Sequence, residues 1–214
     1  MIRIAVVEDQ VLMRSALISL LGLEDDITVI GVAGSGDEIA GLIATASPDV
    51  ILLDIELPGK TGLEALEELR LSHDRLPAAP TEGTGHEIPA VIIVTTFGRA
   101  GYLRRAMDAG ARGFLVKDDP VETLAEAIRR VARGETVVDP LLAAQALSSG
   151  ENPLSEREIQ VLVASDEGAP IADVAEGLHL SPSTVRNYLS SAIGKLGARN
   201  RAEALSNARR EGWI

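Results

Sequence analysis

Short apolar runs alternate with segments of helical periodicity over the first 134 residues of the chain. The apolar runs are nearly continuous, which is typical of parallel strands covered on both faces. They lie at Ile2–Val7, Thr28–Val32, Val50–Leu53, Ala90–Thr95 and Gly113–Val116. The helical segments are Val11–Leu21, Asp37–Ala46, Leu63–Leu71, Tyr102–Ala109 and Val121–Arg133, the last with Asp119-Pro120 as its expected N-cap and first turn. Five strands alternating with five helices predict an α/β doubly wound fold with a five-stranded parallel sheet.

One connection in this region is out of proportion to the others. Residues Ser72 to Pro89 are rich in Pro, Gly and polar residues. A loop of this length is uncommon in a compact domain, which favours a mobile or functional segment. Because the entropy of loop closure grows only slowly with length, a tolerated surface insertion is the simpler interpretation.

A second pattern begins at residue 152 and contains helices only. Ser155 and Glu158 have the spacing of a capping box, which predicts a helix running to about Asp166. Three further helices are expected at about Ile171–Glu176, from Ser181-Pro182 to about Leu196, and at Arg201–Arg210. We therefore divide the chain into an α/β domain (1–134), a linker with a short helix (135–151) and a small all-α four-helix domain (152–214).

Composition excludes several classes of protein. The chain has 214 residues, 46% of them hydrophobic, which suits one large or two small domains. No apolar run approaches the ~20 residues of a membrane span, and Glu8-Asp9 ends the first apolar run where a signal peptide would have small residues. A cytoplasmic location without membrane contact is therefore expected. The absence of Cys excludes disulfides, thiol catalysis and Cys-based zinc sites.

Charge is distributed unevenly along the chain. The net charge is −12, which argues against a uniformly basic surface. Residues 1–134 hold 13 basic and 21 acidic residues, and residues 135–177 hold 1 and 9. In contrast, residues 178–214 hold 6 basic and 2 acidic residues. An acidic chain that ends in a basic segment indicates two functions on one chain.

The carboxyl ends of the predicted strands carry charged and hydroxyl side chains. Glu8 and Asp9 follow the first strand, Asp54 the third, Thr95 ends the fourth and Lys117 follows the fifth. Functional groups collect at this edge of an open parallel sheet. Three converging carboxylates repel one another unless a cation joins them, and oxygen ligands with water nearby suit Mg²⁺. With a hydroxyl and an ammonium group added, the set would accommodate a phosphoryl group on a nucleophilic carboxylate.

These residues, together with the segment LDIELPGKTGLE (53–64), resemble the receiver domain of bacterial response regulators over residues 1–120. The resemblance implies that Asp54 accepts a phosphoryl group from the phosphohistidine of a sensor histidine kinase. It implies Mg²⁺ as cofactor, bound by Glu8, Asp9, Asp54 and the backbone carbonyl of Glu56. Thr95 and Lys117 would contact the phosphoryl oxygens, and Thr95 with Phe114, at the family's aromatic switch position, would form the switch.

Simpler interpretations exist for each of these residues taken alone. Glu8-Asp9 could be an acidic pair at a helix N-terminus, favoured by the helix dipole. Lys117 could be a solvated loop lysine, Thr95 an ordinary strand residue and Phe114 a core residue. Where the switch aromatic is Tyr, its hydroxyl can contact partners; Phe114 lacks that group.

The third helix of the second domain has two distinct faces. Val185, Leu189, Ile193 and Leu196 recur at helical spacing and should pack inward. The opposite face carries small polar residues, which let a helix approach a DNA groove closely. It also carries Asn187, with Arg186 at its flank, and both side chains can form hydrogen bonds with base edges. The candidate DNA contacts are Ser183, Thr184, Arg186, Asn187, Ser190, Lys195, Arg199 and Arg201.

NPLSEREIQVL (152–162) and SPSTVRNYLSSAIGKLGARNRAEAL (181–205) resemble the LuxR-type helix-turn-helix. That resemblance implies a recognition helix at 181–196 in the major groove of double-stranded promoter DNA and a dimerisation helix at about 201–210. Both domains together resemble the NarL/FixJ class of response regulators. TTFGRAGYLRRA (95–106) and TVRNYLSS (184–191) are similar to regulators of membrane-lipid desaturation.

The predicted function is that of a transcriptional regulator, not an enzyme: phosphorylation of Asp54 would promote formation of a homodimer and promoter binding. A Mg²⁺-dependent phosphohydrolase that forms an aspartyl-phosphate is the alternative, although no substrate-specificity domain is evident. A flavodoxin-like cofactor binder is disfavoured, because its phosphate-binding first turn needs Gly, Ser and Thr where this chain has Glu8-Asp9-Gln10.

Overall fold

The computed structural model describes residues 1–74, 89–148 and 152–214. The chain divides into two compact units: residues 1–98 with 103–143, and residues 99–102 with 144–214. None of the helices in the described ranges combines the length and the apolarity that crossing a bilayer requires.

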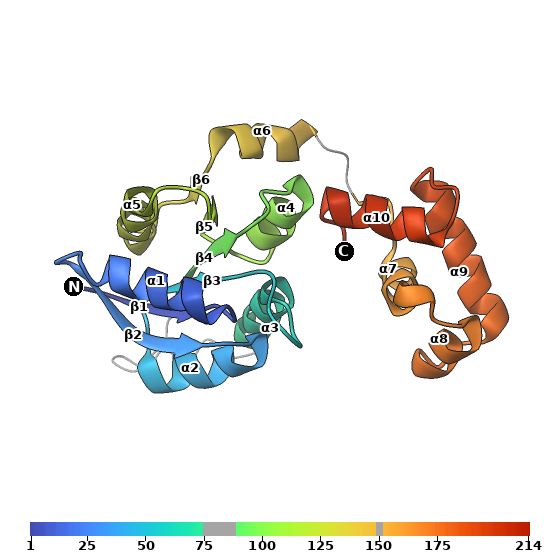
Figure 1. Cartoon of the computed structure of the whole chain (residues 1–214), viewed down its shortest axis with the longest axis horizontal. Coiled ribbons are helices and arrows are strands. Elements are labelled where there is room, and N and C mark those ends of the chain that lie inside the picture. Colours follow the sequence, from blue (N-terminus) through green and yellow to red (C-terminus); the bar gives the residue numbers. More distant parts are fainter. Residues whose placement is uncertain (75–88, 149–151) are drawn as a thin grey trace. The chain divides into compact units, whose positions relative to one another are not determined.

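The first unit is built on a parallel sheet in the strand order β2-β1-β3-β4-β5-β6 (Figure 1). Its strands are β1 (Ile2–Val7), β2 (Ile27–Ala33), β3 (Val50–Leu53), β4 (Ala90–Thr95), β5 (Gly113–Val116) and β6 (Val137–Val138). The central strands are apolar and almost wholly buried, as both-face coverage requires. The expected doubly wound α/β fold is therefore confirmed.

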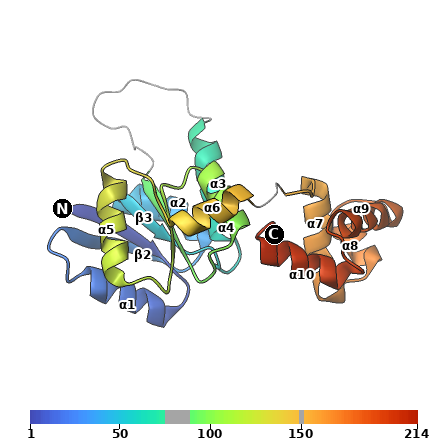
Figure 2. The same ribbon diagram turned by 90° about the horizontal axis from the view of Figure 1, so that it is seen from above.

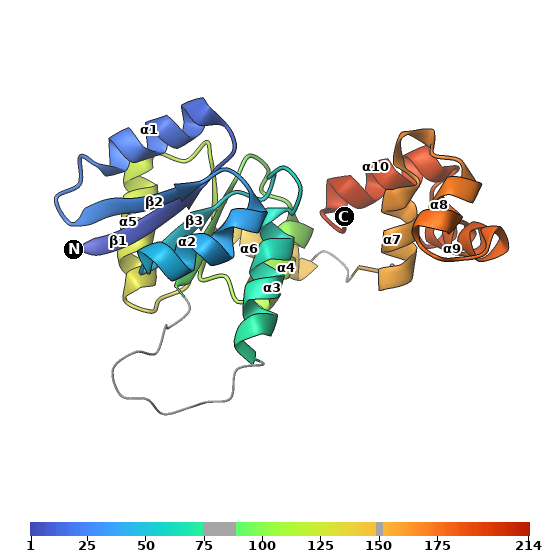
Figure 3. The ribbon, with the colours of Figure 1, turned by 90° about the horizontal axis from the view of Figure 1, so that it is seen from below.

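Helices cover both faces of the sheet (Figure 3). The helices and the 3₁₀ turn of this unit are α1 (Val11–Leu21), η1 (Gly36–Glu38), α2 (Ile39–Ala46), α3 (Gly62–Asp74), α4 (Ala100–Asp108) and α5 (Val121–Ala132). Leu21 of α1 and Leu124 and Ile128 of α5 pack with Ile4, Leu52 and other residues of one sheet face. Helices α2, α3 and α4 each also carry buried apolar side chains.

The sheet has one strand more than the sequence pattern predicts. Val137 and Val138 form β6 beside β5, within the segment expected to be a linker. Gly134 adopts a positive φ of 86°, which lets the chain turn after α5. The Val137 amide then donates a 2.8 Å hydrogen bond to the Arg112 carbonyl. Two β-branched residues are too short a run to stand out by periodicity. The expected linker helix is present as α6 (Pro140–Ser148).

Two further expectations on this unit need revision. Helix α3 continues to Asp74, so the long connection begins later than residue 72, and its residues 75–88 lie outside the described part of the chain. Asp119 is not the N-cap of α5, because Pro120 occupies that position. The Asp119 carboxylate instead accepts a 3.3 Å hydrogen bond from the Val116 amide.

The second unit contains the four expected helices around their own core (orange to red in Figure 2). They are α7 (Glu156–Ala164), α8 (Ile171–Gly177), α9 (Pro182–Lys195) and α10 (Arg201–Glu211), with a 3₁₀ turn η2 at Asp166–Gly168. The capping box at Ser155 and Glu158 is confirmed, and the Ser181 hydroxyl caps α9 by accepting from the Thr184 amide. His179 makes the turn before α9 at a φ of 54°.

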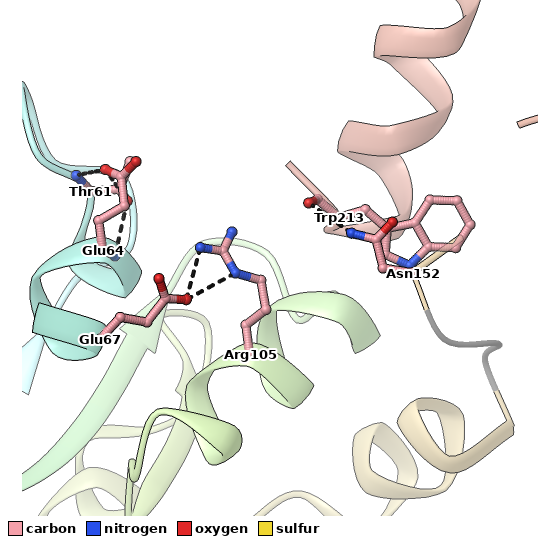
Figure 4. A network of polar contacts seen from close by, with 6 residues as sticks. All are labelled: Thr61, Glu64, Glu67, Arg105, Asn152 and Trp213. Carbon is pink, nitrogen blue, oxygen red and sulfur yellow. Dashed lines mark hydrogen bonds and ion pairs between the residues drawn. The ribbon is translucent and has the colours of Figure 1, made fainter. Parts of the chain in front are cut away.

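Trp213 closes this core from the end of the chain. Its side chain packs against the buried cluster, as its predicted packing role requires. The Asn152 amide donates a 3.4 Å hydrogen bond to the Trp213 carbonyl, and the two residues face each other in Figure 4. The start and the end of the four-helix unit are thereby joined.

Candidate functional site

Three carboxylates meet at the carboxyl edge of the sheet. Glu8 and Asp9 follow β1, and Asp54 follows β3. The Asp54 amide donates a 3.0 Å hydrogen bond to the Val7 carbonyl, which holds the ends of the two strands together. One carboxylate oxygen from each acid lies within 4.8 Å of the others. Because α1 begins only at Val11 and has no acid in its first turn, Glu8-Asp9 is not a dipole pair of that helix.

Lys117 joins two of these acids from the loop after β5. Its Nζ lies 2.7 Å from Glu8 Oε2 and 2.9 Å from Asp54 Oδ2. The side chain is only 5% exposed, which contradicts the interpretation as a solvated loop lysine. Its backbone amide donates a 2.8 Å hydrogen bond to the Thr95 carbonyl, so the loop is also tied to β4.

Two oxygens of the acidic cluster lack protein partners. Within the described part of the chain, Asp9 Oδ1 and Asp54 Oδ1 are buried without a hydrogen bond. Buried polar atoms are normally paired, and each exception needs an explanation such as an ion. Carboxylate oxygens at this spacing are the donor set that suits Mg²⁺. The residues present therefore fit a divalent cation.

Burial and hydrogen bonding have opposite effects on the pKa values of Glu8 and Lys117. Burial raises the pKa of Glu8 above its ordinary value, and the nearby charge of Asp54 adds to this, although the hydrogen bond from Lys117 acts against it. Burial alone would lower the pKa of Lys117. Its hydrogen bonds with Glu8 and Asp54 outweigh that effect, so the pKa of Lys117 is raised and its ammonium form is favoured.

The other predicted residues of this site lie around the cluster. Thr95 ends β4, is fully buried, and its Oγ1 accepts a 3.3 Å hydrogen bond from the Phe97 amide. Phe114 is fully buried on β5 between Ile93 of β4 and Val138 of β6. Glu56 has an exposed side chain two positions after Asp54. The structure thus brings Glu8, Asp9, Asp54 and Lys117 together, with Thr95 tied to them through Lys117.

Gly62 and Thr61 shape the loop that follows Asp54. A Cβ atom at Gly62 would lie 1.9 Å from the Asp54 carbonyl oxygen, so only glycine allows this approach. The Thr61 Oγ1 accepts from the Glu64 amide at 3.3 Å, and the Thr61 amide donates to the Glu64 carboxylate at 2.9 Å (Figure 4). This reciprocal cap starts α3 at the end of the loop that follows Asp54. Sequence reasoning missed both roles, although the Thr-x-x-Glu spacing signals the cap.

A salt bridge links helices α3 and α4. Arg105 on α4 donates to Glu67 Oε1 on α3, with an Nη2 to Oε1 distance of 3.0 Å (Figure 4). Both side chains are partly exposed, so the pair contributes little stability.

Helix α9 presents a polar face to solvent, as predicted. Val185, Leu189 and Ala192 are buried in the core of the unit. The side chains of Ser183, Arg186, Asn187 and Ser190 are exposed, and that of Thr184 is partly buried. Among the described residues, Arg186 has no ion pair. This face therefore carries hydrogen-bonding groups and an unpaired cation.

Glu158 binds two residues of α9, Ser191 and the candidate DNA contact Lys195. Ser191 Oγ donates to Glu158 Oε1 at 2.6 Å, and Lys195 Nζ donates to Glu158 Oε2 at 2.7 Å. The carboxylate is 4% exposed. Burial opposes its ionisation, but the hydrogen bonds from Lys195, Ser191 and Ser155 lower the pKa of Glu158 to about 2. Sequence reasoning identified Glu158 only as a capping residue.

The last two predicted cations also have partners within the unit. Arg199 is exposed and forms an ion pair with Glu203, with Nε 3.0 Å from Oε2. Arg201 Nη1 donates a 2.9 Å hydrogen bond to the Ala169 carbonyl and its side chain is partly buried. Arg201 therefore also holds α10 to the segment before α8.

Comparison with known families gives two matches. Residues 4–129 match the response regulator receiver domain family. Residues 152–208 match the luxR family of bacterial regulatory proteins. The first match covers the acidic cluster and Lys117, and the second covers α7 to α9 and most of α10.

Individual relatives share this architecture over their full length. The chain is 43% identical to the transcriptional regulatory protein DesR of Bacillus subtilis strain 168, over 100% of both chains. It is 39% identical to the response regulator RamR of Streptomyces coelicolor, over 100% of this chain and 98% of that protein. The crystal structure of the response regulator ChrA, from a heme-sensing two-component system, covers 100% of this chain and 98% of its own, at 31% identity and a TM-score of 0.55. The first two relatives are thus named as regulators rather than as enzymes.

Proposed function

Because the chain belongs to the response regulators of the NarL/FixJ class, with a receiver domain followed by a LuxR-type DNA-binding domain, we propose that phosphorylation of Asp54 switches it to promoter binding. It is a regulator of transcription rather than an enzyme. The observation that carries the proposal is the state of the Asp54 carboxylate. One oxygen is held by Lys117 and the other is buried without a partner beside two more acids.

The proposed modification is a transfer of a phosphoryl group from a phosphohistidine of a sensor histidine kinase. A carboxylate oxygen of Asp54 attacks phosphorus, the new O–P bond forms as the N–P bond breaks, and the histidine leaves with the N–P electron pair. Asp54 Oδ1 is the oxygen that suits this attack, since it makes no hydrogen bond within the described chain. Lys117 keeps Oδ2 in place and faces the charge that develops on the phosphoryl oxygens.

The carboxylates of Glu8, Asp9 and Asp54, with the backbone carbonyl of Glu56, would hold a Mg²⁺ ion in this site. When bound, Mg²⁺ neutralises charge on the phosphoryl oxygens and on the clustered carboxylates. The Asp9 oxygen that has no hydrogen bond among the described residues supports this assignment. Without a divalent cation, Lys117 is the one cation of the described residues that pairs with Glu8 and Asp54.

The added phosphoryl group would act on the neighbouring edge of the sheet. It brings a charge of about −1.5 to −2 at neutral pH. Thr95 and Lys117 would turn toward its oxygens, and Phe114 would repack on β5. Because Lys117 donates its amide to the Thr95 carbonyl, a change at either residue reaches both strands. The surface formed by β4, α4 and β5 would then favour a homodimer.

The kinase partner requires a surface beside Asp54. Val11 and Leu12 begin α1 after the acidic pair and Gln10, and they are 66% and 84% exposed. Apolar side chains at this exposure are typical of a surface that a partner covers. The start of α1 is therefore the region that we assign to kinase contact.

The proposed DNA contacts lie on α9, in the turn after it and at the start of α10. Ser183, Thr184, Arg186, Asn187 and Ser190 would face base edges in the major groove, and Arg199 and Arg201 would contact phosphates. One small domain makes few such contacts, so two linked copies bind far more tightly than one. Dimerisation thereby converts phosphorylation into promoter occupancy.

The test is to size the full-length chain with and without Mg²⁺ and a phosphate donor, such as beryllofluoride or acetyl phosphate, and to measure DNA affinity in the same samples. The proposal expects a dimer and tighter DNA binding only when both additions are present. An unchanged mass and affinity in the presence of both would contradict it.

A further inference from the structure

The Glu158 carboxylate connects the helix before the helix-turn-helix to the recognition helix. Its oxygens accept hydrogen bonds from the Ser155 amide at 2.6 Å, Ser191 Oγ at 2.6 Å and Lys195 Nζ at 2.7 Å. Because α7 and α9 both contribute to the same core cluster, the carboxylate lies between two packed elements. Three charge-assisted hydrogen bonds hold this buried side chain in one conformation, unlike an ion pair on a flexible surface.

This contact changes the charge that α9 offers to DNA. The helix carries two cations, Arg186 near its start and Lys195 at its end. Arg186 is exposed and has no ion pair among the described residues. Lys195 is bound to a buried carboxylate, although 41% of its side chain is exposed. The charge available for a phosphate is therefore near the start of the helix.

We propose that Glu158 is a positioning residue that fixes the end of α9 and withholds Lys195 from the DNA phosphates. The inference rests on DNA binding by α9, as proposed above. Non-specific binding, which depends on phosphate contacts, is then weaker than the cations of α9 alone would allow. Discrimination between sequences rests on Arg186 and Asn187, whose side chains remain exposed.

The buried carboxylate should retain Lys195 in the presence of a DNA phosphate, because losing the lysine costs the carboxylate more free energy than it costs the phosphate. A phosphate released from Lys195 returns to its counterions and water, at little cost. Glu158 cannot return to water, because it lies in the core and is held there by Ser155 and Ser191. An unpaired buried charge is strongly unfavourable, so the Lys195 ion pair should persist on DNA.

The experiment measures the salt dependence of binding to a random-sequence duplex by the full-length protein with Mg²⁺ and beryllofluoride. Each phosphate contact of a cation contributes about 0.9 to the slope of log K against log salt concentration. The variants are Lys195→Gln, which keeps a donor for Glu158 without the charge, and Glu158→Gln, which keeps acceptor capacity for the cap but releases Lys195. The double variant Glu158→Gln/Lys195→Gln is the matched control.

The inference expects Lys195→Gln to leave the slope at its wild-type value. Glu158→Gln should steepen the slope by about 0.9 per chain, and the double variant should return to the wild-type slope. Arg186→Gln should lower the slope, because Arg186 is exposed with no ion pair among the described residues, and this control shows that the assay detects a cation of α9 near DNA. A merely structural role of Glu158 would change affinity through folding but would not steepen the slope.

A decrease of about 0.9 in the slope of Lys195→Gln would overturn the inference, since Lys195 would then contact a phosphate. Circular dichroism melts identify any variant that does not fold. If Glu158→Gln fails to fold, the slope of Lys195→Gln still tests the inference, since an unchanged slope supports it and a lower slope overturns it. If the wild-type chain binds neither this duplex nor any sequence selected from a random pool, the proposed function itself fails, which is a different result from a changed slope.

Discussion

Lys117 donates a 2.9 Å hydrogen bond to Asp54 Oδ2 from a position 63 residues further along the chain. The contact leaves Asp54 Oδ1 without a hydrogen bond from any residue in the described ranges, in the cluster with Glu8 and Asp9. The two oxygens of the Asp54 side chain thus differ. Oδ2 is held by Lys117, whereas Oδ1 is available to attack phosphorus. This asymmetry is the physical basis for assigning Asp54 as the phosphoacceptor.

Replacing Lys117 by Met should destabilise the α/β unit. Glu8 and Asp54 would remain buried without the cation that contacts both, and breaking a buried pair costs about 3–5 kcal/mol. Urea unfolding in the absence of Mg²⁺ measures the change in the free energy of unfolding. Lys60→Met is the matched control, because its partners Asp37 and Glu68 are well exposed and the loss of stability should be small. Equal losses for the two variants would contradict the assignment.

Removing a carboxylate of the acidic cluster should weaken Mg²⁺ binding. Asp9→Asn keeps the size of the side chain but removes its negative charge and replaces one carboxylate oxygen by an NH₂ group, which cannot bind a cation. We expect the dissociation constant from calorimetry to rise at least about tenfold, since affinity depends on the charge of the ligands. Glu56→Gln changes only an exposed side chain and should leave Mg²⁺ affinity unchanged. The metal assignment fails if the two variants bind Mg²⁺ alike.

Arg186→Ala should reduce discrimination between DNA sequences. Arg186 is exposed on α9 with no ion pair among the described residues, and a good base contact is worth about 1–3 kcal/mol. Selection from a random duplex pool with wild-type and variant protein measures the loss. Arg199→Ala, at the start of the α10 region, should instead weaken binding to all sequences to a similar extent. An unchanged preference in Arg186→Ala would remove the assigned role.

The stability of the helical unit should depend on acidic pH through Glu158. Its pKa in the folded chain is about 2, below the ordinary value of 4.5, because hydrogen bonds from Lys195, Ser191 and Ser155 outweigh burial. A carboxyl with a depressed pKa stabilises the fold above its unfolded pKa, and this contribution is lost as pH falls through the folded value. The stability difference between wild type and Glu158→Gln should therefore shrink from pH 4.5 toward pH 2. A difference that stays constant over this range would contradict the pairing. Glu156→Gln, at an exposed position of the same helix, is the control.

The sequence predicts the main elements of both units, because their signals are local. Continuous apolar runs identify the five long strands, and the Ser155 and Ser181 caps identify the starts of α7 and α9. Strand β6 escapes this reasoning, since two valines have no periodicity and pair only because Gly134 turns them toward β5. Asp119 shows the same limit: it is placed correctly before a helix, yet its carboxylate caps the end of β5 instead.

In the candidate site, too, the sequence predicts some features and not others. The topology rule alone brings Glu8, Asp54 and Lys117 to one edge of the sheet. The unpaired oxygens of Asp9 and Asp54 depend on atomic positions that no pattern reveals. For Lys195, the residues around it indicate a solvated cation on a polar helix face. Its partner Glu158 lies 37 positions away and is known only once α7 packs on α9.

The most direct test of the account is intact-mass measurement of the protein after incubation with acetyl phosphate and Mg²⁺. Wild type and Asp118→Asn, which changes an exposed acid beside Lys117, should each gain one phosphoryl group. Asp54→Asn should gain none, and omission of Mg²⁺ should suppress labelling of wild type and of Asp118→Asn. Labelling of Asp54→Asn to the same extent as wild type would contradict Asp54 as the acceptor, and with it the proposed switch.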